Sequence, residues 1–107
     1  MYIITNTTPI GEYTPSKAET FEEAQNFMYK TTINNYVSSG YGFPDFAEET
    51  NTEECSSYDE LKAKNLVKSF LDWIVEQGDG EYTETSTTIY YDADEFNEMN
   101  IYNLDEL

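Results

Sequence analysis

Negative charge is the property of this sequence that most restricts how the chain can fold. The 107 residues include 22 acidic residues against five lysines, with no arginine and no histidine, and the formal net charge is −17. Repulsion between these charges works against a compact state. A net charge of magnitude about 2–8 is enough to keep a small domain soluble. The charge beyond this range lowers the stability of the fold, so a hydrophobic core has to compensate for it. It also calls for a functional explanation.

Aromatic side chains are the material from which such a core can be built. Hydrophobic residues make up only 38% of the chain, but aromatic residues reach 16%, with ten tyrosines and six phenylalanines. Acidic disordered segments are poor in aromatic residues. We therefore predict a single folded domain over residues 1–107, in which buried rings contribute about 25 cal/mol for each Å² of apolar surface removed from water.

The composition also bears on the environment of the protein. A single cysteine, Cys55, cannot form an internal disulfide and fits a reducing compartment. The first ten residues do not have the basic and apolar regions of a secretory leader, and no stretch approaches the roughly 20 apolar residues of a membrane span. These features predict a soluble, cytoplasmic protein. The acidity disfavours direct binding to nucleic acid or to an anionic membrane.

The first half of the chain contains one clear strand and one clear helix. Tyr2–Thr8 is rich in β-branched and aromatic residues, which predicts a strand, and Ile10–Lys17 has the composition of a loop. Thr20 followed by Glu23 has the form of a capping box, and the apolar spacing after it predicts a helix. That helix should end near Ser39, with Gly40 beyond its last turn.

The middle of the chain is predicted to be a long connection followed by a second helix. Residues 41–56 follow neither the helical nor the strand period, and Phe43 and Phe46 should hold this connection against the body. Ser57 and Glu60 form a second capping box, followed by the clearest apolar stripe in the chain. We predict a helix over residues 58–77 that ends at Gly78. Asp59 and Glu60 are spaced to pair with lysines on its first half.

The last part of the chain is predicted to complete a sheet. The Thr- and Tyr-rich segment 81–91 indicates a hairpin that turns near residues 85–87, with one long strand as the alternative. Ile101–Leu107 indicates a closing strand or a docked tail. Asp92–Glu95 can cap a short helix that carries Phe96 and Met99. The predicted fold class is α+β, with a small antiparallel sheet from residues 2–8 and 81–91 packed on two main helices plus a short third helix.

The acidic residues are distributed unevenly along the sequence. Residues 1–44 hold four acids and two lysines, and residues 45–60 hold seven acids and no base. Lys62, Lys64 and Lys68 lie close together, and from Ser69 to the end there are eleven acids and no positive residue. Salt adaptation would spread the acids more evenly. Interleaving of the acids with predicted helices and strands indicates that the fold holds them in fixed places.

Fixed negative charges with few compensating cations are what imitation of DNA requires, because duplex DNA carries one charge for about every 1.7 Å of its axis. We therefore hypothesise an inhibitor that occupies the nucleic-acid groove of a basic DNA-handling protein. In size and acidity alone, the chain resembles the small inhibitors of restriction enzymes and CRISPR nucleases that phages and mobile elements carry. The alternatives are an acidic accessory protein of a mobile element or operon, without mimicry of DNA, and an acidic composition that reflects salt adaptation alone. The residues predicted to bind the partner are Asp45, Glu48, Glu49, Glu53, Glu54, Asp59, Glu60, Asp72, Glu76, Asp79, Glu81, Glu84, Asp92, Asp94, Glu95 and Glu98.

Catalysis is difficult to build from these residues. The chain has no histidine to act as a general base near neutral pH and no arginine to clamp a phosphate. Cys55 follows two glutamates, a setting opposite to the electropositive surroundings of reactive thiols. Paired carboxylates for glycoside hydrolysis are not specific evidence among so many acids. We therefore expect no enzymatic activity.

A calcium site is the better small-ligand alternative. Asp92, Asp94 and Glu98 have an alternating pattern of oxygen ligands, but they do not follow the twelve-residue calcium loop. A helix-capping role for the two aspartates is the simpler interpretation. Zinc is disfavoured by the absence of histidine and the single cysteine. We expect neither a cofactor nor a metal.

Overall fold

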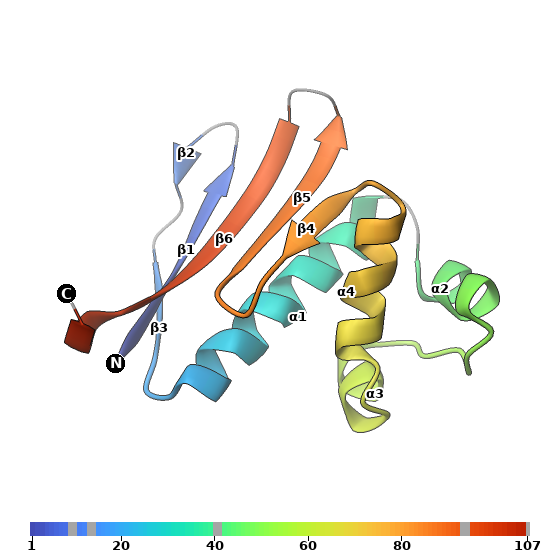
Figure 1. Cartoon of the computed structure of the whole chain (residues 1–107), viewed down its shortest axis with the longest axis horizontal. Coiled ribbons are helices and arrows are strands. Elements are labelled where there is room, and N and C mark those ends of the chain that lie inside the picture. Colours follow the sequence, from blue (N-terminus) through green and yellow to red (C-terminus); the bar gives the residue numbers. More distant parts are fainter. Residues whose placement is uncertain (9–10, 13–14, 40–41, 93–94, 107) are drawn as a thin grey trace.

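The chain forms two layers, an antiparallel sheet and a group of helices (Figure 1). The computed structural model describes residues 1–8, 11–12, 15–39, 42–92 and 95–106. The molecule measures 43 × 33 × 18 Å, and the short dimension fits one sheet packed on one helical layer. The α+β class predicted from the sequence is confirmed.

The sheet has the strand order β2-β1-β6-β5-β4, and β3 also pairs with β1. At its centre, β1 from the start of the chain pairs with β6 from its end, and in this register Ile4 is opposite Ile101. The predicted strand at residues 2–8 and the predicted hairpin are both present, but the hairpin turns at residues 83–85, two residues earlier than predicted. The predicted loop at residues 10–17 contains two short strands that pair with β1. The strands are β1 Tyr2–Thr8, β2 Gly11–Glu12, β3 Ser16–Ala18, β4 Gly80–Tyr82, β5 Ser86–Asp92 and β6 Glu95–Asn103.

The prediction of a short helix that carries Phe96 and Met99 is wrong, because this segment belongs to β6. Strand β6 lies between β1 and β5 and is hydrogen-bonded to both of them. Met99 and Ile101 are buried two residues apart, which is the period of a strand with one face on the core. Pairing with two neighbouring strands therefore outweighs the local capping signal of the preceding aspartates.

Helix α1, Phe21–Ser39, runs behind the sheet in Figure 1 and begins and ends where the sequence predicted. The Thr20 hydroxyl accepts the Glu23 amide at 3.1 Å, as a capping box requires. The Glu23 carboxylate accepts from the backbone amide of Glu19, whereas a complete capping box would have it accept from the amide of Thr20. Gly40, predicted to lie beyond the last turn, is outside the described residues.

The single helix predicted over residues 58–77 is two helices, α3 Tyr58–Ala63 and α4 Val67–Glu76. The break is at Asn65, whose φ of 58° is in the left-handed region. The amide of Leu66 donates to the carbonyl of Leu61, and the amide of Asn65 donates to that of Lys62. These two bonds form a Schellman ending, in which asparagine replaces the usual glycine.

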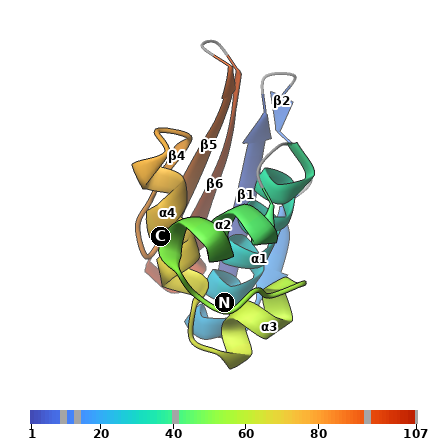
Figure 2. The ribbon, with the colours of Figure 1, turned by 90° about the vertical axis from the view of Figure 1, so that its right-hand side faces the viewer.

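The connection at residues 41–56, predicted to be irregular, contains the helix α2, Phe43–Thr50. Pro44 is at the start of this helix, where its missing amide costs nothing. As predicted, Phe46 holds the segment to the body: its side chain is 1% exposed and its ring centroid lies 4.8 Å from that of Phe70. Figure 2 looks onto the end of the molecule formed by α2 and α3.

Candidate functional site

The predicted site residues between 45 and 60 lie on α2, on α3 and on the segment that joins them. Most of these side chains are exposed, and we call them the α2–α3 acidic group: Asp45, Glu48, Glu49, Glu53, Glu54, Asp59 and Glu60. Two members have structural roles, because the Asp45 carboxylate accepts the Gly42 amide and the Glu60 carboxylate accepts the amide and the hydroxyl of Ser56. The bonds from Ser56 lower the pKa of Glu60.

Lysines partly compensate the α2–α3 acidic group. Lys64 Nζ lies 3.2 Å from a carboxylate oxygen of Glu53, and Lys30 Nζ lies 4.0 Å from one of Asp59. The pairing predicted within the helix, from Asp59 and Glu60 to nearby lysines, is not among the ion pairs of the described residues. One observed pair joins α1 to α3, and the other joins the residue after α3 to the segment before it.

A second set of acids surrounds β4, the strand at one edge of the sheet. This β4-edge acidic group has no lysine within ion-pair distance among the described residues, and its members are Asp72, Glu76, Asp79, Glu81, Glu84 and Glu98. Register connects its two strand residues, because Glu81 is opposite Thr88 and Thr88 is opposite Glu98. The two glutamates therefore lie on one face of the sheet, two strands or about 9.5 Å apart.

Tyrosines fix two carboxylates of the β4-edge acidic group. The Tyr36 hydroxyl donates to Asp79 at 2.7 Å, and the Tyr82 hydroxyl donates to Asp72. Burial, followed by the hydrogen bond and the charge of Asp72, raises the pKa of Tyr82 to about 12. Tyr82 therefore stays protonated at neutral pH and remains a donor. The first bond ties the turn after α4 to α1 and the second ties α4 to β4, so this part of the acidic surface is fixed by the fold.

Three predicted site residues, Asp92, Asp94 and Glu95, are described only in part or not at all. Asp92 and Glu95 are opposite each other in the register of the two strands, and only their backbone is described. Asp94 lies outside the described residues. The capping role that the sequence suggested for Asp92 has no helix to cap, because Glu95 begins a strand.

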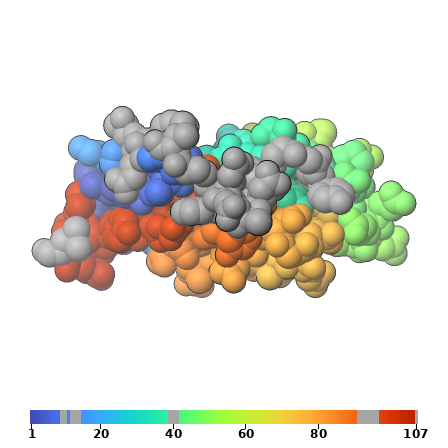
Figure 3. Space-filling model, turned by 90° about the horizontal axis from the view of Figure 1, so that it is seen from above, coloured from blue at the N-terminus to red at the C-terminus, as the bar shows by residue number. Residues whose placement is uncertain are grey.

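Exposed acids occur at both ends of the molecule. In Figure 3 the segment containing α2 (green) forms one end, and the end of β6 with the residues after it (red) forms the other. Glu48 and Glu49 are exposed at the first end, and Asp105 and Glu106 at the second. Thirteen of the sixteen predicted residues therefore belong to the two groups, while other acids lie outside both of them.

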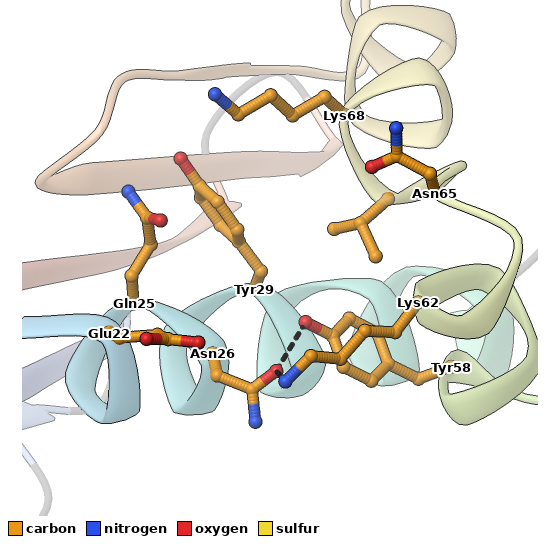
Figure 4. A pocket seen from close by; sticks show the side chains of 9 residues that line it. Glu22, Gln25, Asn26, Tyr29, Tyr58, Lys62, Asn65 and Lys68 are labelled. Carbon is orange, nitrogen blue, oxygen red and sulfur yellow. Dashed lines mark hydrogen bonds between the residues drawn. The ribbon is translucent and has the colours of Figure 1, made fainter.

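A surface cavity of about 330 Å³ between α1, α3 and α4 carries positive side chains (Figure 4). Lys62 and Lys68 line it, and neither has a carboxylate within ion-pair distance in the part of the chain that is described. We call it the lysine cavity. The residues that line it are Glu22, Gln25, Asn26, Tyr29, Tyr58, Lys62, Asn65, Val67 and Lys68.

Hydrogen bonds fix the walls of the lysine cavity. The side-chain oxygen Oδ1 of Asn26 accepts from the Tyr58 hydroxyl at 2.9 Å and from Lys62 Nζ at 3.0 Å, as Figure 4 shows. The Tyr29 hydroxyl donates to the Thr83 carbonyl and the Gln25 amide donates to the Glu84 carbonyl. Together these bonds tie α1 to α3 and to the turn between β4 and β5.

Both tyrosines of the lysine cavity stay neutral at physiological pH. Burial, followed by the charge of Asp59 and the influence of Tyr29, raises the pKa of Tyr58 to about 12. Burial, followed by the charge of Glu84, raises the pKa of Tyr29. The two hydroxyl groups therefore add no negative charge, and the charged side chains that line the cavity are two lysines and Glu22.

One sequence feature is related to this cavity: Lys62, Lys64 and Lys68 are close together in the sequence. Within a single predicted helix, these lysines are expected to pair with neighbouring acids instead of lining a cavity. Asn26 and Tyr29 carried no signal of their own, because their hydrogen-bond partners are residues 32 and 54 positions further along the chain. The convergence appears only when α1 packs against α3 and the hairpin.

The described residues contain no group of three or more histidine, cysteine, aspartate or glutamate side chains arranged to hold a metal ion. Cys55 is buried with a free thiol. Within the same residues, no helix has both the length and the apolar character needed to cross a lipid bilayer. Comparison of the chain with models of protein families, with curated proteins and with solved structures gives no significant match. The function therefore has to be inferred from the chain's own charges and surfaces.

Proposed function

We propose that the protein binds the cationic nucleic-acid groove of a DNA-handling protein and excludes DNA from it. The observation that carries this proposal is the β4-edge acidic group. Its exposed carboxylates sit on α4, on β4 and on the turn after β4, with no lysine paired to any member among the described residues. A cationic groove supplies the positive charges that the chain itself does not.

Fixed carboxylates bind such a groove better than mobile ones. Helix α4 is anchored by Phe70, Leu71 and Trp73, which are at most 2% exposed, so Asp72 and Glu76 project from a rigid support. A surface that is already ordered loses little conformational entropy on binding. A disordered acidic tail with the same charge would lose more, and would present no constant spacing.

The net charge of −17 also affects the rate of association. Opposite charge on two proteins steers their encounter and raises the association rate, and salt screens this effect beyond about 8–10 Å at physiological ionic strength. We expect fast association with a cationic partner and a steep decrease in rate with added salt.

A binding panel with competing DNA tests the proposal. The panel consists of purified DNA-binding proteins with cationic grooves, and binding is measured with and without duplex DNA. Mutual exclusion between this protein and DNA supports mimicry. Simultaneous binding of both to one partner rules it out, and so does an absence of binding to every member.

Two matched double variants show which acids touch the partner. Glu76→Gln with Glu81→Gln removes two charges from the β4-edge acidic group, and Glu19→Gln with Glu106→Gln removes two exposed charges elsewhere. Both pairs change the net charge equally, so they should slow association to a similar extent. Only the first pair should also speed dissociation, because the dissociation rate depends on the interactions made within the complex. Equal dissociation rates for the two pairs would exclude the β4 edge from the interface.

A second candidate function, an interaction protein without mimicry of DNA, is favoured by the sheet face opposite α1. Thr87 and Met99 face α1, so the neighbouring strand residues face away from it. Tyr90 and Tyr102 lie on this outer face and are 43% and 47% exposed. Exposed tyrosines are frequent in protein interfaces. A partner that engages this face instead of the acids would tolerate DNA, and the same competition experiment would show it.

A further inference from the structure

We infer that the lysine cavity receives a carboxylate side chain of the partner, and that the partner is a metal-dependent nuclease whose metal-binding carboxylates lie in its cationic groove. This inference rests on the proposed function and names the chemistry of the partner. It starts from the placement of Lys62 and Lys68, whose ammonium groups have no carboxylate of this chain within ion-pair distance in the described residues.

The two lysines have hydrogen-bonding capacity to spare. Lys62 Nζ gives one of its three hydrogens to Asn26, and that bond holds the ammonium group at the cavity wall. Lys68 reaches the cavity from α4, on the side opposite Asn26 (Figure 4). The two ammonium groups therefore lie on opposite sides of the cavity, one from α3 and one from α4. A carboxylate of the partner can pair with either of them.

Acids surround this positive centre. Glu22 lines the cavity itself, and Asp59 and Glu60 lie on the same short helix as Lys62. On the hairpin side, Gln25 binds the Glu84 carbonyl, and the ring of Tyr29 packs against Tyr82, the tyrosine that donates to Asp72. The surface therefore has two lysines in a hollow with carboxylates around it, of which Asp59 is paired with Lys30.

The complement of this pattern is a cationic groove with negative charge at its centre. Nucleases that use two metal ions have this arrangement, because carboxylates hold the ions that act on the scissile phosphate, and basic residues around them bind the DNA backbone. A surface with acids alone would be repelled by these carboxylates. Lys62 and Lys68 would instead pair with them, in the positions where metal ions would otherwise supply the positive charge.

The sign of one substitution separates this inference from simple charge attraction. Lys62→Gln with Lys68→Gln makes the protein more negative by two charges, so attraction alone predicts tighter binding to a cationic partner. The inference predicts weaker binding, by about tenfold or more, because the partner's carboxylates lose their counter-charges in the complex. Lys68→Gln alone is matched by Lys17→Gln, an exposed lysine of β3 that is not part of the cavity.

The experiment uses metal-dependent nucleases that bind the wild-type protein, together with DNA-binding proteins that have a basic groove and no metal site. Dissociation constants are measured for wild type, Lys62→Gln/Lys68→Gln, Lys68→Gln and Lys17→Gln, and thermal melting confirms that each variant is folded. We expect the cavity variants to weaken binding to the nucleases, and Lys17→Gln to leave it unchanged or tighter. The loss should disappear when the nuclease carries Asp→Asn at a metal-binding position.

Each outcome has a defined meaning. If the cavity variants bind the nucleases as tightly as wild type or more tightly, the lysine cavity is not a carboxylate site, and the proposed function stands on the acidic surface. If wild type binds only the proteins without a metal site, the inference about the partner is wrong and the proposed function survives. If wild type binds no protein of the panel, both fail.

Discussion

At the scale of single residues, tyrosines allow an acidic chain with few aliphatic residues to form a core. The rings of Tyr29, Tyr36 and Tyr58 are 4% exposed, and each hydroxyl donates to a fixed acceptor on another element. A buried ring contributes apolar area, and its paired hydroxyl avoids the cost of an unsatisfied polar group. Two of these side chains, Tyr29 and Tyr58, therefore belong to the core and also line the lysine cavity.

The raised pKa of Tyr58 predicts a loss of stability at alkaline pH. Folding raises this pKa from 10.0 to about 12, so the folded state keeps the proton longer than the unfolded state does. The stabilisation is complete below pH 10 and is lost as the pH rises to about 12. The free energy of unfolding, measured with urea at steps from pH 8 to 12, should fall in this window. Tyr58→Phe should make the fall shallower, and an unchanged slope would contradict the assignment.

A buried hydroxyl pair between α1 and β5 predicts strong non-additivity. The oxygens of Thr32 and Thr87 are 2.7 Å apart, and both residues are at most 4% exposed. Either single Thr→Val substitution leaves one buried hydroxyl without this partner, at a cost of about 1–3 kcal/mol. The double Thr→Val variant removes both groups, so its cost should be clearly less than the sum of the two single costs. Additive costs in urea unfolding would show that the pair is not coupled.

At the scale of elements, left-handed residues decide where three of the helices end. Asn51, Asn65 and Gly78 have positive φ angles and follow α2, α3 and α4. Gly78 was predictable, because glycine is the usual residue at this position. The two asparagines were not, because asparagine also occurs inside helices and in loops. The apolar spacing continues across Asn65, which is why one helix was predicted where two exist.

The other errors of prediction also come from information that is not local. Capping boxes and the strand at residues 2–8 could be predicted because they depend on residues close in sequence. Residues 95–103 form a strand because they pair with β1, which lies at the other end of the chain. The candidate site divides in the same way. The acidic segments could be predicted from the sequence, whereas the lysine cavity needs Asn26 to meet Tyr58 and Lys62.

The ending of α3 gives a test at this scale. Asn65 has a φ of 58°, which glycine adopts without strain and alanine does not. We expect Asn65→Ala to lower the free energy of unfolding by about 1–2 kcal/mol, and Asn65→Gly to change it by less. Urea denaturation of both variants measures the difference. Equal effects of alanine and glycine would show that the left-handed ending is not needed for the turn between α3 and α4.

At the scale of the whole molecule, uncompensated charge opposes folding. The net charge is −17, and the described residues contain two lysine–carboxylate pairs, both with exposed carboxylates. Exposed pairs of this kind contribute at most about 1 kcal/mol each. The buried aromatic and aliphatic side chains therefore have to outweigh the repulsion. Keeping the β4-edge acidic group without lysine partners makes the protein less stable than its core would allow.

If the β4-edge acidic group binds the partner, removing its charges should raise the stability of the fold and weaken binding to the partner. Glu76→Gln with Glu81→Gln relieves repulsion, so the melting temperature at low salt should rise, where a gain of about 1 kcal/mol corresponds to about 4–8 °C. Added NaCl should stabilise wild type more than this variant, because screening replaces what the substitutions remove. The same variant should dissociate faster from a cationic partner than Glu19→Gln/Glu106→Gln does. A composition that reflects only adaptation to salt would give both variants the same melting temperature and the same dissociation rate, because no location would then matter more than another.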